Sequence, residues 1–200
     1  MILKLYKTTF KNGKKELRHW VWQTYIHQVV FSKMSDGDIY HWCDVGCHFN
    51  KNGIKRLKDY IKMVSSDNKG FLFFSYKKPN LNKEFERYIF PSNYEYQYTK
   101  TDLFNHFNLS PNDEIAKSPQ VWGGSFFLKK TPFSIDLIKE HYEITRNRYD
   151  LIDDDEKKFI EKKHDGFIAH RHSQSVLSIL AKKANCEFLS AYESEWALDN

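Results

Sequence analysis

Apolar and polar positions along the chain follow two periods, one typical of strands and one typical of helices. Two segments of strand length, Ile39–Cys43 and the continuous apolar run Phe71–Ser75, are predicted to be buried strands. A third predicted strand, 120–128, carries a glycine pair in its interior, which often marks close approach of a ligand or another backbone. Shorter candidates lie at 1–10, before an Asn-Gly turn, and at 186–192.

A period near 3.6 residues predicts helices at 18–34, 54–64, 99–107, 134–148 and 174–183. The core-facing positions predicted for the first two are Val21, Tyr25, Val29 and Val30, and then Ile54, Leu57, Tyr60, Ile61 and Val64. Because strands and helices alternate, the pattern predicts an α/β fold. We expect a single domain over residues 1–200, with a mainly parallel central sheet flanked by helices.

Composition and charge narrow the classes of protein. The hydrophobic share of 40% and aromatic share of 16% exclude a disordered chain. A net charge of +5 suits a phosphorylated ligand or an anionic membrane surface, but it is too diffuse to indicate nucleic acid. The basic clusters at 11–15 and 157–163 are interpreted as solvated surface. No apolar run approaches the roughly 18 residues that a membrane span requires.

The three cysteines form no even disulfide framework, which favours a reducing compartment. Cys43, Asp44, Cys47 and His48 could be assembled into a zinc site on paper. Strand geometry opposes that site, because neighbouring residues such as Cys43 and Asp44 point to opposite faces. We therefore expect a cytoplasmic protein, with contact at the inner face of a membrane left open.

Candidate chemistry begins at Asp44, which ends the first strand and precedes a turn at Gly46. A carboxylate at the carboxyl edge of an α/β sheet can hold a divalent metal against a phosphorylated ligand. The alternative is that Asp44 only caps the turn. A second cluster, 170–174, crowds the start of a predicted helix, where free N–H donors and partial positive charge favour anions. Its histidines could instead cap the helix or lie in the core.

Lys100 and Asp102 form a third polar group, and another carboxylate could lie within 153–155, where a solvated loop is the alternative. If the three groups share one sheet edge, they supply a metal carboxylate, cations for a diphosphate and an imidazole. That set suits displacement of a nucleotide diphosphate. A sugar donor would also use flat rings for packing, and the candidates are Trp20, Trp22 and Trp122.

In chain order, five elements resemble a family of bacterial and viral glycosyltransferases of capsule, lipopolysaccharide or capsid glycan synthesis. These elements are Trp20-Val-Trp22, residues 38–47, Tyr98-Thr-Lys-Thr-Asp102, Gln120 and His170-Arg-His-Ser-Gln-Ser175. The resemblance covers 18–185, between an extension or first strand at 1–17 and a strand or tail at 186–200. It implies a GT-A-like fold with an abbreviated N-terminal strand. The implied partners are a UDP- or GDP-linked sugar, a glycan or glycolipid acceptor and Mn²⁺ or Mg²⁺.

Residues and resemblance together assign the site. The catalytic set is Asp44, Asp102 and His172, and the metal set is Asp44 and His172. Donor or acceptor binding is assigned to Trp20, Trp22, Lys100, Gln120, Gly123, Gly124, His170, Arg171 and Gln174. The sequence makes three departures from the pattern: Gln23-Thr24 replaces Lys-Pro, Gly46 replaces a second acid and Ser173 replaces Asp. These departures leave open a catalytically impaired relative that acts as a glycan-binding or assembly subunit.

Overall fold

Three strands of the central sheet run in one direction, and the fourth opposes them. The computed structural model describes residues 20–79 and 90–196. The strands are β1 (Ile39–Cys43), β2 (Phe71–Ser75), β3 (Val121–Lys129) and β4 (Phe188–Ser190), in the spatial order β1-β3-β2-β4. β3 pairs antiparallel with both β1 and β2, whereas β2 and β4 are parallel. The chain thus forms an α/β domain with a mixed sheet.

The predicted α/β fold is confirmed, but the sheet is mixed and not purely parallel, because two of its three strand pairings are antiparallel. Hydrophobic runs indicate burial on both faces, which a central strand requires whichever way it points. β2 shows this, because all five of its residues are buried. The prediction that Ile39–Cys43 is also a buried strand was wrong, because β1 lies at the edge of the sheet and all five of its residues are only half-buried. Direction instead depends on the route between strands, and the 76–120 connection returns β3 between β1 and β2 in the opposite sense.

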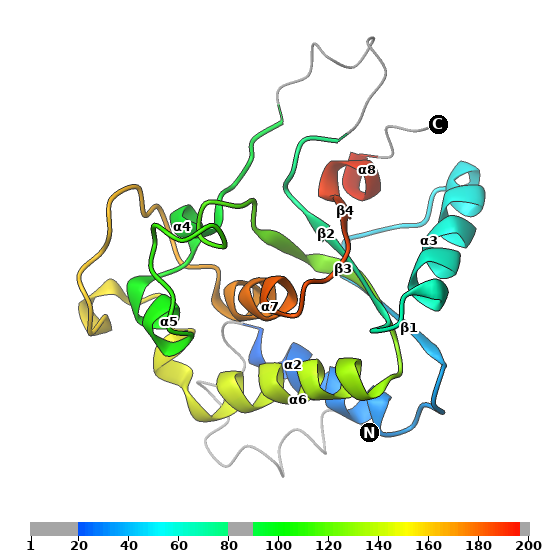
Figure 1. Cartoon of the computed structure of the whole chain (residues 1–200), viewed down its shortest axis with the longest axis horizontal. Coiled ribbons are helices and arrows are strands. Elements are labelled where there is room, and N and C mark those ends of the chain that lie inside the picture. The colour runs from blue at the N-terminus through cyan, green and yellow to red at the C-terminus, as the bar shows by residue number, and fades with distance from the viewer. Residues whose placement is uncertain (1–19, 80–89, 197–200) are drawn as a thin grey trace.

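Helices cover both faces of the sheet (Figure 1). On one face, α2 (Val21–Phe31), α6 (Pro132–Asn147) and α7 (His172–Lys183) pack over Phe73 and Phe126. On the other face, α3 (Ile54–Ser66) and α8 (Ala191–Trp196) pack over Phe74 and Phe127. Successive strand side chains therefore enter different cores, as the pleat requires.

Short elements complete the fold beside the sheet. They are α4 (Glu95–Tyr98), α5 (Thr101–His106) and the 3₁₀ turns η1 (Lys51–Gly53), η3 (Tyr149–Leu151) and η4 (Glu156–Lys158). Each of the five segments predicted to be helical contains a helix. The segment 186–192, predicted to be a strand, contains the short strand β4 and the beginning of α8. The predicted strand at 1–10 lies outside the described residues. No described helix is both long and apolar enough to cross a membrane.

Two predicted helix faces differ from the structure. In α3, Tyr60 and Val64 are buried, but Ile54 and Ile61 are 56% and 39% exposed. In α2, Val21 is buried, while Tyr25, Val29 and Val30 are only half-buried. The buried face of α2 instead contains the polar residues Gln23, Thr24 and His27. Hydrophobic spacing missed this face because polar side chains bury readily where partners are present.

Candidate functional site

A cavity of about 290 Å³ lies where β1 ends and α7 begins. It is lined by Trp20, Gln23, Asp44, Trp122, Gly123, Gly124, His170, Arg171, His172, Ser173 and Gln174. The parallel direction of β1 and β2 places their carboxyl ends at the edge where β3 starts. The structure thus brings Asp44 and the 170–174 cluster into one site, although they are far apart in the sequence.

Asp44 presents its carboxylate at the end of β1 while its backbone closes the turn. The Asp44 N–H donates to the Gly124 carbonyl at 2.9 Å, and the Asp44 carbonyl accepts from the Cys47 N–H at 2.9 Å. The indole Nε1–H of Trp42 donates to Asp44 Oδ1 at 3.1 Å. Burial raises the pKa of the Asp44 carboxyl, and the Trp42 hydrogen bond opposes that rise. The carboxylate is therefore partly desolvated and oriented, which suits a cation ligand.

His172 and Trp20 stack on each other at the cavity, and both have left-handed backbones. Their φ angles are 50° and 61°, a region that costs a non-glycine residue free energy. Their ring centroids are 5.7 Å apart with an interplanar angle of 26°. His172 Nδ1 donates to the Ile152 carbonyl at 3.0 Å, so a neutral ring carries its acceptor nitrogen at Nε2. Nε2 lies 3.8 Å from an Asp154 carboxylate oxygen.

Arg171 supplies the cation of the cavity. Its guanidinium carbon lies 4.1 Å from the Tyr98 ring centroid and 5.5 Å from that of Tyr76. Among the residues that the structure describes, no carboxylate forms an ion pair with Arg171. Arg171 also stands at the N-cap of α7, the positive end of that helix dipole. The aromatic rings hold the charge in place without neutralising it, as an anion site requires.

Close packing explains the glycine pair in β3. A Cβ on Gly124 would lie 2.4 Å from the Trp122 ring, and one on Gly123 would lie 3.3 Å from the Gln174 side chain. Gln174 Oε1 accepts from the Gly123 N–H at 3.0 Å, and Gln23 Nε2 donates to the Gly123 carbonyl at 3.4 Å. The space that the glycines leave is thus filled by side chains that form the cavity wall.

Replacing Gly124 with alanine is expected to push the Trp122 ring out of the cavity wall. Overpacking of this kind typically costs about 1–3 kcal/mol of folding free energy. Near-UV circular dichroism would report the ring movement, and urea unfolding would report the stability. Gly46→Ala is the matched control, because nothing lies within 4 Å of its added Cβ. Unchanged spectra and stability in Gly124→Ala would contradict the packing role.

Gln120 lies behind the cavity wall and links Gln174 to a buried ion pair. Gln174 Nε2 donates to Gln120 Oε1 at 2.8 Å. Gln120 Nε2 donates in turn to Glu95 Oε1 at 3.0 Å, and Glu95 Oε2 pairs with Lys182 Nζ at 2.6 Å. Gln120 and Glu95 are fully buried. Gln120, predicted as a binding residue, therefore orients one that lines the cavity.

Lys100 and Asp102 are placed away from the cavity lining. Lys100 Nζ donates to the carbonyls of Asp150 at 2.5 Å and Asp153 at 2.8 Å, and burial lowers its pKa. Asp102 Oδ1 accepts from the backbone N–H groups of Ile160 and Glu161, at 3.2 and 3.1 Å. Both side chains thus hold the 150–161 segment, which carries the partners of His172. The predicted catalytic role of Asp102 has no contact in the described structure that supports it.

The remaining assigned residues support the cavity. His170 lines it, and its Nδ1 accepts from the Lys100 N–H at 3.4 Å. Trp22 is absent from the lining and lies with its ring centroid 6.3 Å from that of Trp42. Sequence reasoning missed Trp42 as a site residue, although its place two residues before Asp44 puts both on one strand face. It also treated Gln23 only as a departure from the family pattern.

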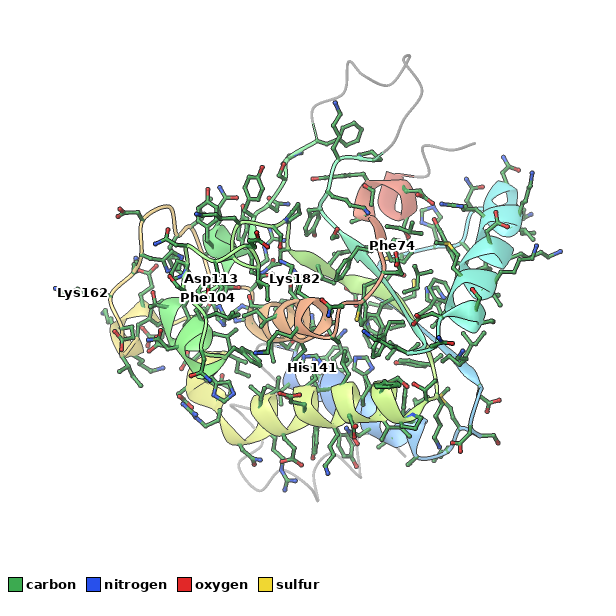
Figure 2. The ribbon with its side chains drawn as sticks, viewed as in Figure 1. Phe74, Phe104, Asp113, His141, Lys162 and Lys182 are labelled. Atoms are coloured by element: carbon green, nitrogen blue, oxygen red, sulfur yellow. The ribbon has the colours of Figure 1, made fainter. Side chains whose placement is uncertain are left out.

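Two buried histidines lie beneath the site. Figure 2 shows His141 between α6 and α7, where its Nε2 donates to the Ser173 carbonyl at 2.9 Å. His27 Nδ1 shares a hydrogen bond of 2.9 Å with the Tyr40 hydroxyl, and its ring meets the Trp42 ring edge-on at 4.8 Å. Burial lowers the pKa of both imidazoles, that of His141 to about 4. Both are therefore neutral at pH 7.

Stability is expected to fall as pH drops through the range between the folded and unfolded pKa values of His141, about 4 and 6.5. In this range the unfolded chain binds a proton that the folded chain does not, so acid favours unfolding. Above that range, this histidine adds no pH dependence. His141 alone lowers the free energy of unfolding by about 2 kcal/mol between pH ~7 and ~5, and His27 acts in the same direction.

Urea unfolding at several pH values would measure this loss. His141→Gln keeps a donor for the Ser173 carbonyl but does not titrate, so its stability should depend less on pH. His48→Gln is the control, because His48 is exposed. An unchanged pH dependence in His141→Gln would contradict the assignment.

The cavity lining offers one carboxylate, Asp44, and two imidazoles, those of His170 and His172, as metal ligands. Within 20–79 and 90–196, no three His, Cys, Asp or Glu side chains are grouped to hold a metal ion. Mg²⁺ often uses only one or two carboxylates, with phosphates and water as its other ligands, so the donor set fits a cation that arrives with a diphosphate. Comparison with protein-family models, curated proteins and solved structures finds no match for this chain.

Proposed function

We propose that this chain transfers a sugar from a nucleotide-sugar to a glycan or glycolipid acceptor, with the cavity as the donor site. The observation that carries the proposal is that Asp44 and the 170–174 cluster line one cavity. A nucleotide diphosphate needs positive charge and a cation ligand, which Arg171 and Asp44 offer. A sugar ring needs a flat apolar surface, which the half-exposed Trp20 indole offers. The order of motifs in the sequence supports the same activity.

Each group has a distinct task in the proposed transfer. Arg171 and the N-terminus of α7 bind the diphosphate. Asp44 would hold Mn²⁺ or Mg²⁺, which neutralises charge on the leaving phosphates. The bond from the anomeric carbon to the diphosphate oxygen breaks, and a bond to the acceptor oxygen forms. The acceptor proton must then pass to a base, and His172, beside Asp154, is the cavity residue whose chemistry suits this.

Calorimetry and a turnover assay with UDP- and GDP-linked sugars, each with and without Mn²⁺, would test the proposal. We expect at least one donor to bind and its nucleotide diphosphate to be released when an acceptor is present. Absence of donor binding under every condition would overturn the proposal. Arg171→Met should weaken binding of the diphosphate alone, which locates any binding within this cavity.

A binding role without catalysis is the second candidate. It is favoured by the single carboxylate in the cavity lining, since the positions of Gly46 and Ser173 supply no second acid. Ser173 is also buried, and its carbonyl accepts from His141. In this case the chain is a glycan-binding or assembly subunit. Donor or glycan binding without release of nucleotide diphosphate would favour this role, and turnover by the purified chain would exclude it.

A further inference from the structure

We propose that one outer surface of this protein binds an anionic membrane. This basic-apolar surface is defined by Val45, Phe49, Lys51, Ile54, Lys55, Lys58, Ile61 and Lys62, all of them exposed. It begins at the residue after Asp44 and continues along α3. The inference goes beyond the proposed function and is tested without it.

The geometry of α3 turns this set of side chains outward. Ile54, Lys58 and Ile61 are spaced by four and three residues, so they share one helix face. Tyr60 and Val64 lie on the side of the helix that is buried against the sheet. Figure 1 shows α3 at the outer edge of the fold, away from α6 and α7. Ile54 and Ile61 therefore do not contribute to the core, and their side chains can contact a partner outside the protein.

The charge of this surface is not neutralised within the described structure. Among the residues described, none of the four lysines of the surface forms an ion pair. Arg56, on the same helix, is occupied by Glu193 at 2.5 Å and lies 3.9 Å from Asp59. The lysines thus present unpaired positive charge around the exposed apolar side chains.

Another lysine-rich segment of the chain shows the contrast. In 156–163, Ile160 is 76% exposed, but acids pair with two of the neighbouring lysines. Lys158 pairs with Asp153 at 2.9 Å and with Asp155 at 3.0 Å, and Lys163 pairs with Glu156. The two segments therefore share composition but differ in free charge, which makes the second a natural control.

A bilayer with anionic lipids fits the basic-apolar surface better than other partners. Phe49 and the isoleucines can enter the boundary between headgroups and acyl chains, while lysines contact the phosphates. A second copy of the chain would place lysines against lysines, which repel. A polynucleotide would satisfy the lysines but leave the aliphatic side chains in water. If the proposed function holds, a bilayer here would place the end of β1 beside a lipid-linked acceptor.

Co-sedimentation of the full chain with lipid vesicles would test the inference. We expect binding to vesicles that contain phosphatidylglycerol, little binding to phosphatidylcholine alone, and weaker binding as salt rises. Replacing Lys55, Lys58 and Lys62 together with glutamine should lower vesicle binding roughly a hundredfold. Phe49→Ser should lower it about tenfold, because the ring no longer enters the membrane. Circular dichroism would confirm that each variant is folded.

The control variant combines Ile160→Ser with Lys158→Gln and Lys163→Gln, which removes exposed apolar and basic groups elsewhere. It should bind vesicles within about twofold of the parent chain, because those two lysines are paired with acids. Three outcomes would overturn the inference: no binding to anionic vesicles, equal loss in the control, or a polynucleotide that competes vesicles off the same surface. None of these readouts uses a nucleotide-sugar, so failure here is distinct from failure of the proposed function.

Discussion

Replacement of Asp44 by asparagine is expected to lower sugar transfer by more than about a hundredfold without unfolding the protein. Loss of an outer partner of a metal ligand typically costs 10–100-fold in affinity or activity, and loss of the ligand itself should exceed this. Asparagine keeps the size of the side chain but removes the charge that would hold the cation. The measurement is release of nucleotide diphosphate, together with calorimetry of Mn²⁺ and the donor.

Two further variants make this prediction specific. Trp42→Phe removes the N–H that donates to Asp44 Oδ1 and should lower transfer by about 10–100-fold. Asp36→Asn is the control, since the Asp36 side chain is 92% exposed and lies in the turn before β1. Full activity in Asp44→Asn, in a preparation whose parent chain transfers sugar, would remove Asp44 from the mechanism and leave the cavity a binding site.

The convergence of Asp44 with 170–174 could be predicted from the sequence, because both clusters stand at element ends. A carboxylate that ends a buried strand and polar residues that begin a helix meet at the same edge of an α/β sheet. Neither the position of Asp44 at a strand end nor that of 170–174 at a helix start depends on the order of the strands in the sheet. The prediction therefore does not depend on a parallel sheet: the antiparallel pairing of β1 and β3 directs the carboxyl end of β1 toward the start of β3.

The roles of Lys100 and Asp102 could not be predicted in the same way. A polar residue that binds a ligand and one that satisfies buried backbone groups have the same appearance in a sequence. In the folded chain, these two side chains bond the backbone of a segment that begins about 50 residues later. Contacts at such separation depend on the packed structure, where buried polar groups must find partners.

Hydrophobic spacing was also insufficient for α2 and α3. It assigned Ile54 and Ile61 to the core, because their spacing matches the buried stripe, but both are exposed. It also assigned Tyr25, Val29 and Val30 of α2 to the inner face, although these are only half-buried and Thr24 and His27 are fully buried. Thr24 Oγ1 lies 2.9 Å from Thr145 Oγ1 of α6. This hydrogen bond offsets the cost of burying the polar face of α2 in the core.

Replacing Lys182 with methionine is expected to lower the free energy of unfolding by about 3–5 kcal/mol, the usual cost of leaving a buried charge unpaired. Figure 2 labels Lys182, which extends from α7 and whose side chain is 7% exposed. Its partner Glu95 is fully buried and also accepts from Thr99 Oγ1 at 2.6 Å. Without Lys182, the carboxylate keeps its neutral donors but loses its opposite charge. Urea unfolding would measure the loss.

The double variant Glu95→Gln with Lys182→Met should recover most of that loss, because no buried charge remains. Lys158→Met is the matched control: its pair with Asp153 is at 2.9 Å, but the lysine is 60% exposed, so the free energy of unfolding should change much less than in Lys182→Met. Because Gln120 links Glu95 to Gln174, Lys182→Met should also weaken donor binding in the cavity. Equal free energies of unfolding in the Lys182→Met and Lys158→Met variants would show that the Lys182–Glu95 ion pair does not stabilise the fold around the cavity.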